Sequence, residues 1–221
     1  MKMKISPSMM CADLANVSGC ISQLEKGNAE YLHIDVMDGC FVPNYALGTD
    51  FIRALRKITN IPLDIHLMIA DTDNKLDIID IKENDIVSVH CESTIHLHRV
   101  LCKIKSKGAK AFVALNPATP LCAVEEIFDT ADGFVIMSVN PGFAGQEMVP
   151  STLDKARRLR ALLDSKGYTE SEIEIDGHVS WANIPVMKDC GANIFVTGTS
   201  GVFGCENLTE GMNRMRKMLE E

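Results

Sequence analysis

The chain lacks the features that mark several classes of protein. Its 221 residues carry a formal net charge of −8 and contain no run of lysine or arginine, which argues against nucleic acid or an anionic membrane as the main partner. No apolar run approaches the roughly 18 residues of a membrane span, and no basic-then-apolar leader of signal-peptide form is present. We therefore expect a cytoplasmic protein.

Cysteine pairs and linkers are missing as well. The eight cysteines include no CxxC pair, which favours buried or incidental thiols over a disulfide framework. No stretch rich in proline, glycine and serine divides the chain, and none is of low complexity. The composition is that of a globular protein with a sizeable core, and we expect one domain over residues 1–221.

Short apolar segments rich in β-forming residues recur along the chain, with segments of helical periodicity between them. One such helical segment carries Leu14, Val17, Ile21 and Leu24. This alternation predicts an α/β protein with parallel strands, and eight repeats predict a closed (β/α)8 TIM barrel. An open doubly wound sheet is the alternative, but it would normally carry GxGxxG after its first strand, where this chain has ISPSMMCADL. The predicted strands are 4–8, 31–36, 63–68, 86–90, 111–115, 134–139, 173–177 and 194–198.

The segment YLHIDVMDG places polar side chains on a strand that reads as buried. Side chains alternate between the faces of a strand, so His33 and Asp35 share one face. By the same alternation Asp64, His66 and Met68 share a face in the third strand, and Glu174 and Asp176 share one in the seventh. A buried charge costs several kcal/mol unless it is paired or binds a metal.

Two imidazoles and two carboxylates from three strand ends predict a divalent-metal site. On a TIM barrel these ends face the active-site mouth. Mixed nitrogen and oxygen ligands suit zinc, iron(II), manganese or cobalt, and the ligand types do not choose among them. The alternative is that His33 and His66 are core histidines with ordinary partners and that the aspartates are helix caps.

Two glycine-containing loops follow the sixth and the eighth predicted strands. They read NPGFAGQ, residues 140–146, and GTSG, residues 198–201. Glycines let backbone N–H groups point at one spot, and TIM barrels often bind phosphate after their late strands. Neither loop contains lysine or arginine, so we expect a phosphate to be held by backbone amides and hydroxyl groups.

Five segments resemble the signature segments of the ribulose-phosphate 3-epimerase family, in order and spacing, over nearly the whole chain: HIDVMDGCFVPN, LDIHLM, NPGFAGQ, IEIDG and VTGTSGVF. The resemblance implies a metal-dependent isomerase that inverts C3 of a phosphorylated ketose through an enediolate. It implies one divalent ion per subunit bound by His33, Asp35, His66 and Asp176, with Asp35 and Asp176 also forming the acid–base pair. The substrate-binding residues that it implies are Ser8, Met37, His66, Met68, Met137, Gly142, Phe143, Ala144, Gly145, Gly177, Gly198, Thr199 and Ser200.

Some positions depart from the common family pattern. Ala144 stands where many members have glycine, Cys40 stands where they have histidine, and TGTSG replaces a strand end that often reads AGS. The FAGQ and GTSG forms favour the branch acting on D-allulose 6-phosphate, with D-ribulose 5-phosphate as the alternative substrate. The native metal and the roles of Cys40, His90 and His178 stay open, and we expect a homo-oligomer because barrels of this size commonly bury apolar helix faces.

Two other function classes also fit parts of the sequence. A sugar-phosphate lyase would share the phosphate loops but should place a lysine at a strand end, and none of the eight predicted strands ends in one. A non-catalytic sugar-phosphate binding protein would keep the glycines without needing Asp35 and Asp176 together.

Overall fold

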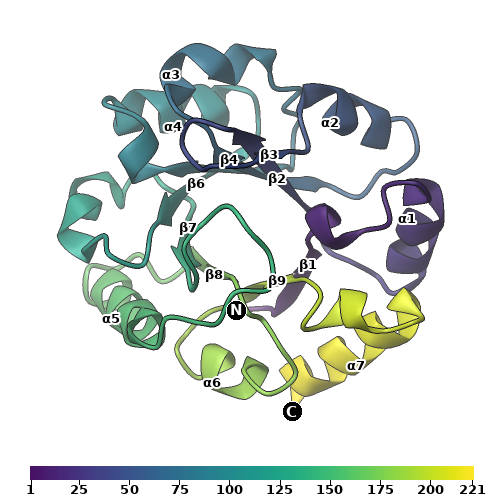
Figure 1. Cartoon of the computed structure of the whole chain (residues 1–221). Helices are drawn as coiled ribbons and strands as arrows, with labels where there is room; N and C mark the ends of the chain where they lie inside the picture. The colour runs from purple at the N-terminus through teal and green to yellow at the C-terminus, as the bar shows by residue number, and fades with distance from the viewer.

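The computed structural model describes residues 1–221 and confirms the predicted barrel. All strands belong to one sheet with the order β1-β9-β8-β7-β6-β5-β4-β2-β3, and every pairing is parallel except that of the short β3. A parallel bridge between Ser8 and His33 joins the first strand to the second and closes the ring (Figure 1). The strands are β1 (Lys4–Pro7), β2 (Leu32–Asp38), β3 (Tyr45–Ala46), β4 (Leu63–Met68), β5 (Ile86–His90), β6 (Lys110–Leu115), β7 (Gly133–Met137), β8 (Glu172–Asp176) and β9 (Ile194–Thr197).

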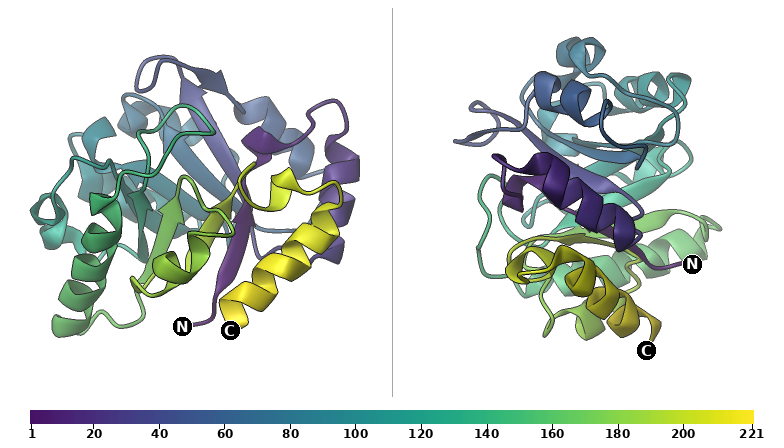
Figure 2. Two further views of the ribbon diagram at one scale, coloured as in Figure 1. Left: turned by 60° about the horizontal axis from the view of Figure 1, so that its bottom comes forward. Right: turned by 90° about the vertical axis from the view of Figure 1, so that its right-hand side faces the viewer.

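Helices surround the strands, as Figure 2 shows from two sides. They are α1 (Val17–Lys26), α2 (Thr49–Leu55), α3 (Thr72–Lys75), α4 (Leu97–Ser106), α5 (Ser151–Ser165), α6 (Ile184–Lys188) and α7 (Leu208–Glu220). Short 3₁₀ turns cover Met9–Cys11, Leu76–Ile78, Cys91–Ser93, Leu121–Ala123, Glu125–Ile127 and Val202–Gly204. The two turns after β6, which follow Pro117 and Pro120 in the chain, stand in place of a full helix. No helix is both long and apolar enough to span a bilayer.

The first helix begins later than its periodicity predicts. Leu14 is 56% exposed and precedes α1, which starts at Val17. The Asp13 carboxylate accepts the Ala15 N–H at 2.9 Å, and the Asp13 carbonyl accepts the Asn16 N–H at 2.9 Å. Asp13 therefore favours a turn here over another turn of helix.

The barrel has two main cores, and a small third cluster of Met37, Val42 and Met68 lies apart from them. The large one lies between the outer face of the strands and the helices, where α5 and α7 contribute residues at helical spacing, such as Ala156, Leu159, Leu163, Met212 and Met215. The second core lies inside the barrel and consists of Tyr31, Ile86, Phe112, Ala114, Val135, Met137 and Ile194. Polar side chains from β2, β4, β5 and β8 are buried as well, and they build the site.

Candidate active site

Strand alternation and register bring the four expected metal ligands together. The pairing of β2 with β4 places His33 beside Asp64 and Asp35 beside His66. Asp176 ends β8, beside Met137 of β7. His33, Asp35 and His66 are buried, while the Asp176 side chain is 15% exposed toward the mouth.

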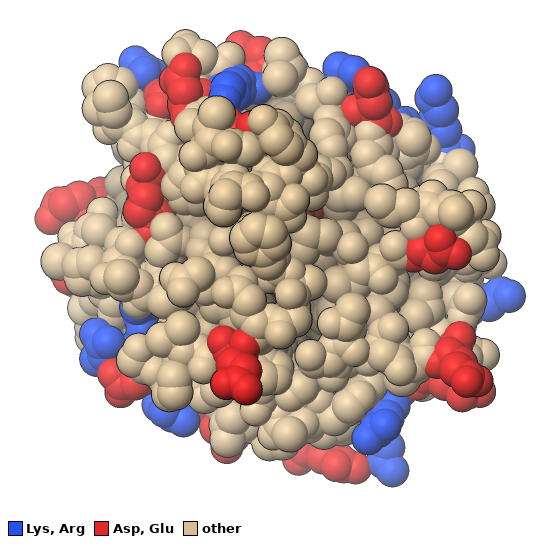
Figure 3. All heavy atoms as spheres, in the orientation of Figure 1, with Lys and Arg blue, Asp and Glu red and all other residues tan.

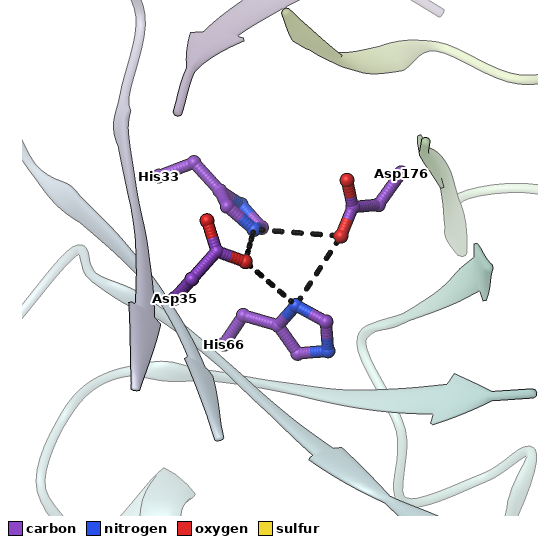
Figure 4. A group of neighbouring side chains, drawn as sticks. All are labelled: His33, Asp35, His66 and Asp176. Carbon is purple, nitrogen blue, oxygen red and sulfur yellow. Dashed lines mark ion pairs between the residues drawn. The ribbon is translucent and has the colours of Figure 1, made fainter. Parts of the chain in front are cut away.

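The two histidines and two aspartates form a ring of close contacts (Figure 4). His33 Nε2 lies 3.3 Å from Asp35 Oδ1 and 3.7 Å from Asp176 Oδ2. His66 Nδ1 lies 3.5 Å from the same Asp35 oxygen and 3.3 Å from the same Asp176 oxygen. The four ligand atoms all lie within 4.8 Å of one another. One oxygen of each carboxylate and one nitrogen of each ring therefore converge on the same space.

This donor set suits a divalent cation. His33 Nε2 and His66 Nδ1 are buried and make no hydrogen bond, although buried polar atoms almost always have a partner. Both nitrogens face two carboxylate oxygens, which are anionic acceptors (Figure 4). Two neutral imidazoles and two carboxylates form a usual ligand set for zinc and for other first-row divalent ions. The residues present fit such an ion.

The other ring nitrogen of His33, Nδ1, is hydrogen-bonded to a buried carboxylate. His33 Nδ1 lies 2.6 Å from Asp64 Oδ2, which also accepts the Ser6 hydroxyl at 2.8 Å. Burial alone lowers the pKa of His33, but the carboxylates of Asp64 and Asp35 outweigh burial and raise it well above its usual value. Glu174 lies 3.5 Å from the same nitrogen, and burial together with the charge of Asp64 raises its pKa well above its usual value. The surroundings of His33 thus favour positive charge.

The opposite nitrogen of His66 contacts a third histidine. His66 Nε2 and His90 Nε2 are 2.9 Å apart, and both rings are fully buried. Burial lowers the pKa of His90 to about 4. Burial also lowers the pKa of His66, but Asp176 and Asp35 outweigh it, so the pKa of His66 is raised. The sequence left the role of His90 open, and the structure makes it a partner of His66.

Ser8 contacts Asp35 rather than only facing the mouth. Its hydroxyl donates to Asp35 Oδ2 at 2.7 Å and leaves Oδ1 facing the histidines. Burial raises the pKa of Asp35, but His33 and His66 outweigh burial and hold the pKa well below its usual range. Asp35 is thus an ionised carboxylate with one oxygen fixed and the other directed into the site.

A pocket opens above the four residues, and Asp35 and Asp176 form part of its lining. The expected substrate-binding residues line it together, with the exception of His66, which lies behind them: Ser8, Met37, Met68, Met137, Gly142, Phe143, Ala144, Gly145, Gly177, Gly198, Thr199 and Ser200. The three methionines are at most 5% exposed and come from β2, β4 and β7. The pocket has the mixed apolar and polar lining of a small-molecule site.

One end of the pocket is formed by backbone. Gly142 and Gly177 have φ angles of +122° and +111°, which side-chain-bearing residues rarely adopt, and a Cβ on Gly177 would lie 2.7 Å from Val139. No lysine or arginine lines the pocket. Figure 3 shows the same charge pattern, because its lysines and arginines lie around the edge of the face and not at its centre.

Some pocket residues were not predicted from the sequence. Cys11 follows β1 and lines the pocket, and its Sγ would lie 3.0 Å from a Cβ placed on Gly198. His178 has a φ of +46°, and its Nδ1 accepts the Met148 N–H at 3.0 Å, which joins the loop after β8 to the loop after β7. Proximity to Ser8 and Asp176 in the chain was the only signal for either residue. Cys40, in contrast, is exposed outside this pocket.

Solved structures of other proteins share this fold. KGPDC from Streptococcus mutans matches with a TM-score of 0.66 at 12% sequence identity, over 100% of this chain and 98% of that chain. The 3-hexulose-6-phosphate synthase from Salmonella typhimurium matches with a TM-score of 0.65 at 13% identity, over 99% of each chain. At such low identity these matches establish the fold alone.

Sequence relatives are much more similar. Ribulose-phosphate 3-epimerase from Bacillus subtilis (strain 168) is 41% identical over 213 residues, which cover 96% of this chain and 98% of the relative. The chloroplastic ribulose-5-phosphate-3-epimerase of Arabidopsis thaliana is 44% identical over 214 residues, covering 96% of this chain and 75% of the relative. These names support the alternative pentulose substrate, and the preference for D-allulose 6-phosphate inferred from FAGQ and GTSG is not supported.

The family model points the same way. The model of the ribulose-phosphate 3 epimerase family matches residues 4–203, from the first strand to the turn that precedes α7. The resemblance inferred from the five sequence segments is therefore confirmed. The chain belongs to the ribulose-phosphate 3-epimerase family and is an isomerase of the carbohydrate epimerase class.

Proposed function

We propose that the chain interconverts D-ribulose 5-phosphate and D-xylulose 5-phosphate by inverting C3. The observation that carries this proposal is the pair of carboxylates, Asp35 and Asp176, which reach the same two bare imidazole nitrogens from separate strands at the floor of the pocket. The two relatives named for this activity, at 41% and 44% identity, support the choice of a pentulose phosphate.

Inversion at a carbon beside a ketone needs two proton carriers. One group removes the proton from one face of C3, and a second group returns a proton to the opposite face. Asp35 and Asp176 lie on β2 and β8, on opposite sides of the two histidines in Figure 4. We assign one carboxylate to each face of C3. The roles exchange in the reverse direction, because the carboxylate that gained the proton then donates it.

His33, Asp35, His66 and Asp176 would hold one divalent ion, whose identity among zinc, iron(II), manganese and cobalt stays open. A bound ion supplies Lewis-acid stabilisation of the negative charge that develops on the substrate oxygens. The protein residues hold the donor atoms in place: Ser8 fixes the second oxygen of Asp35, and Asp64 fixes His33. Ligands held in this way need little rearrangement when an ion binds.

The remaining pocket residues position and shield the substrate in this proposal. Met37, Met68 and Met137 present apolar, polarizable walls that offer the reacting carbon no competing proton. Backbone N–H groups near Gly142, Gly145, Gly177 and Gly198, together with the hydroxyls of Thr199 and Ser200, would bind the phosphate. This explains how an acidic protein binds an anionic sugar without a lysine or arginine in its pocket.

The lyase alternative finds no support in the pocket. A lyase that forms a Schiff base needs a lysine amine within reach of the substrate carbonyl, and no lysine lines the cavity. The non-catalytic alternative gives no reason for two carboxylates beside two bare histidine nitrogens. The assembly of the chain into a homo-oligomer stays a prediction.

The experiment is a turnover assay with controlled metal content. The protein is stripped with a chelator, its metal content is verified, and D-xylulose 5-phosphate formation from D-ribulose 5-phosphate is measured before and after each of the four ions is restored. We expect the stripped protein to lose activity and at least one ion to restore it. Full activity in verified metal-free protein would contradict the metal-dependent mechanism, and inactivity with every ion would contradict the epimerase assignment.

A further inference from the structure

A chain of hydrogen bonds runs from His66 to the surface. His66 Nε2 lies 2.9 Å from His90 Nε2, and the two ring planes differ by 22°. His90 Nδ1 lies 3.3 Å from Glu92 Oε2, whose side chain is 25% exposed. Phe41 packs on His90 with ring centroids 4.7 Å apart. The chain thus links a buried histidine of the site to a partly exposed carboxylate.

Glu92 is held as a charged acceptor. Its other oxygen, Oε1, accepts the Asn116 N–H at 3.0 Å and the Thr119 hydroxyl. Burial raises the pKa of Glu92, but the hydrogen bonds from His90, Thr119 and Asn116 outweigh burial and lower the pKa to about 2. An ionised carboxylate can only accept hydrogen bonds, so the His90 nitrogen that faces it must carry the proton.

These contacts fix the proton positions along the chain. A neutral imidazole carries one proton, so a proton on His90 Nδ1 leaves His90 Nε2 as an acceptor. His66 Nε2 must then carry the proton that His90 Nε2 accepts, which in a neutral His66 leaves Nδ1 bare. His66 Nδ1 is the nitrogen that points between Asp35 and Asp176 (Figure 4). A metal ion binds the bare nitrogen of a neutral imidazole.

The reverse arrangement is unfavourable at both ends. If His90 Nε2 donated to His66, the bare Nδ1 of His90 would face the carboxylate of Glu92 without a proton between them. His66 would then carry its proton on Nδ1, and that nitrogen could no longer bind a cation. The geometry therefore favours a single direction of donation, from His66 to His90 to Glu92.

We propose that His90 and Glu92 are positioning residues of the metal site, which hold His66 with its proton on Nε2 and with Nδ1 free to bind the ion. The inference rests on the proposed metal-dependent function and extends it to two residues outside the four ligands. Each histidine ligand is then backed by a carboxylate. Asp64 contacts His33 Nδ1 directly, and Glu92 acts on His66 through His90. Neither His90 nor Glu92 touches the reacting atoms in this scheme.

The test compares zinc binding by two matched variants. Glu92→Gln keeps the size of the side chain but can turn its NH₂ group toward His90 Nδ1, which favours the wrong tautomer of both histidines. The control is Asp73→Asn, because Asp73 lies in the same surface groove as Glu92 and accepts from Arg99 and Thr94 without contacting either histidine. Zinc dissociation constants are measured by chelator competition on folded protein, with the melting temperature recorded for each variant.

We expect Glu92→Gln to bind zinc about 10–100-fold more weakly than the wild type, which is the usual cost of losing a partner of a metal ligand. Asp73→Asn should bind within about twofold of the wild type. Equal zinc affinity in folded Glu92→Gln and in the wild type would overturn the proposal. Failure of the variant to fold would leave the decision to the measurement on the wild type described next.

That second measurement reads the tautomer directly. In wild-type protein with ¹⁵N-labelled histidine, the nitrogen spectrum at neutral pH should show His90 protonated at Nδ1 and bare at Nε2, with His90→Gln used to assign its signals. A proton on His90 Nε2 would overturn the proposal even if activity is normal. Epimerase turnover by the wild type is measured separately. If the protein binds zinc with the expected tautomers but does not epimerise the pentulose, only the proposed function is refuted.

Discussion

Replacement of Asp176 by asparagine tests the division of work between the two carboxylates. The side chains have nearly the same shape, but an amide cannot carry the proton. The fold should persist, because the backbone carbonyl of Asp176 is unchanged by the substitution. This carbonyl accepts hydrogen bonds from the Ser138 N–H at 2.7 Å and from the Ser138 hydroxyl at 3.0 Å. Loss of one acid–base group should lower kcat about 10²–10⁴-fold, or about 3–5 kcal/mol in the barrier.

The informative signal is hydrogen exchange at C3. In Asp176→Asn, Asp35 can still remove the C3 proton of one epimer and return a solvent proton to the same face. We therefore expect the variant to incorporate deuterium at C3 of one sugar phosphate, D-ribulose 5-phosphate or D-xylulose 5-phosphate, without converting it to the other. Asp35→Asn should show the reciprocal pattern with the other epimer.

The assay follows deuterium at C3 by NMR in D₂O, at equal zinc content for every protein, because Asp176 is also an expected ligand. Asp154→Asn is the control, since Asp154 pairs with Arg158 on the exposed face of α5. Epimerisation by Asp176→Asn at the wild-type rate would refute the reasoning. Exchange in both epimers at similar rates would also refute it, because a single carboxylate would then serve both faces.

Three further predictions address the metal, the substrate and the buried charge. His66→Ala should weaken zinc binding, measured by chelator competition, by more than the about 10–100-fold that loss of a residue behind a metal ligand costs. Unchanged affinity would show that His66 is not a ligand. At equal metal content, kcat/KM should be about 10–200-fold higher for D-ribulose 5-phosphate than for D-allulose 6-phosphate. The hexulose has one more CHOH unit, which must fit between the reacting carbon and the phosphate loops. A higher kcat/KM for the hexulose would contradict this prediction. Metal-free Glu174→Gln should melt at a higher temperature than the wild type at pH 7. The raised pKa of Glu174 means that the folded state holds this proton more tightly than the unfolded state, so stability is lost as the pH rises above the ordinary value of 4.5. The gain from Glu174→Gln should shrink as the pH is lowered toward that value, and a gain that does not change with pH would contradict the assignment.

The strands and the main cluster could be predicted because they depend on simple periodicities. All eight predicted strands overlap barrel strands of the structure, since buried parallel strands need short runs of apolar, β-forming residues. Alternation along three strands was enough to place His33, Asp35, His66 and Asp176 on the barrel interior. Leu14 misled the prediction of the first helix, because periodicity does not register the turn that Asp13 forms.

The partners behind the ligands could not be predicted in this way. Asp64 and Glu174 were known to share a face with the ligands, but the 2.6 Å contact of Asp64 with His33 depends on strand register and side-chain rotamer. The contact of His90 with His66 joins residues on adjacent strands at different heights, because His66 pairs with Ser88 in the register of β4 and β5. Short motifs such as FAGQ do not determine the conformation of the loops that contain them, and the substrate preference inferred from FAGQ and GTSG was not supported.

The most direct test of the central claim is a single incubation of the metal-loaded wild type with D-ribulose 5-phosphate in D₂O, followed by NMR. If two carboxylates exchange a proton at C3 of the pentulose, D-xylulose 5-phosphate should form and carry deuterium at C3. Formation of D-xylulose 5-phosphate that keeps the original C3 hydrogen would contradict the two-carboxylate mechanism, and absence of D-xylulose 5-phosphate would contradict the proposed activity itself.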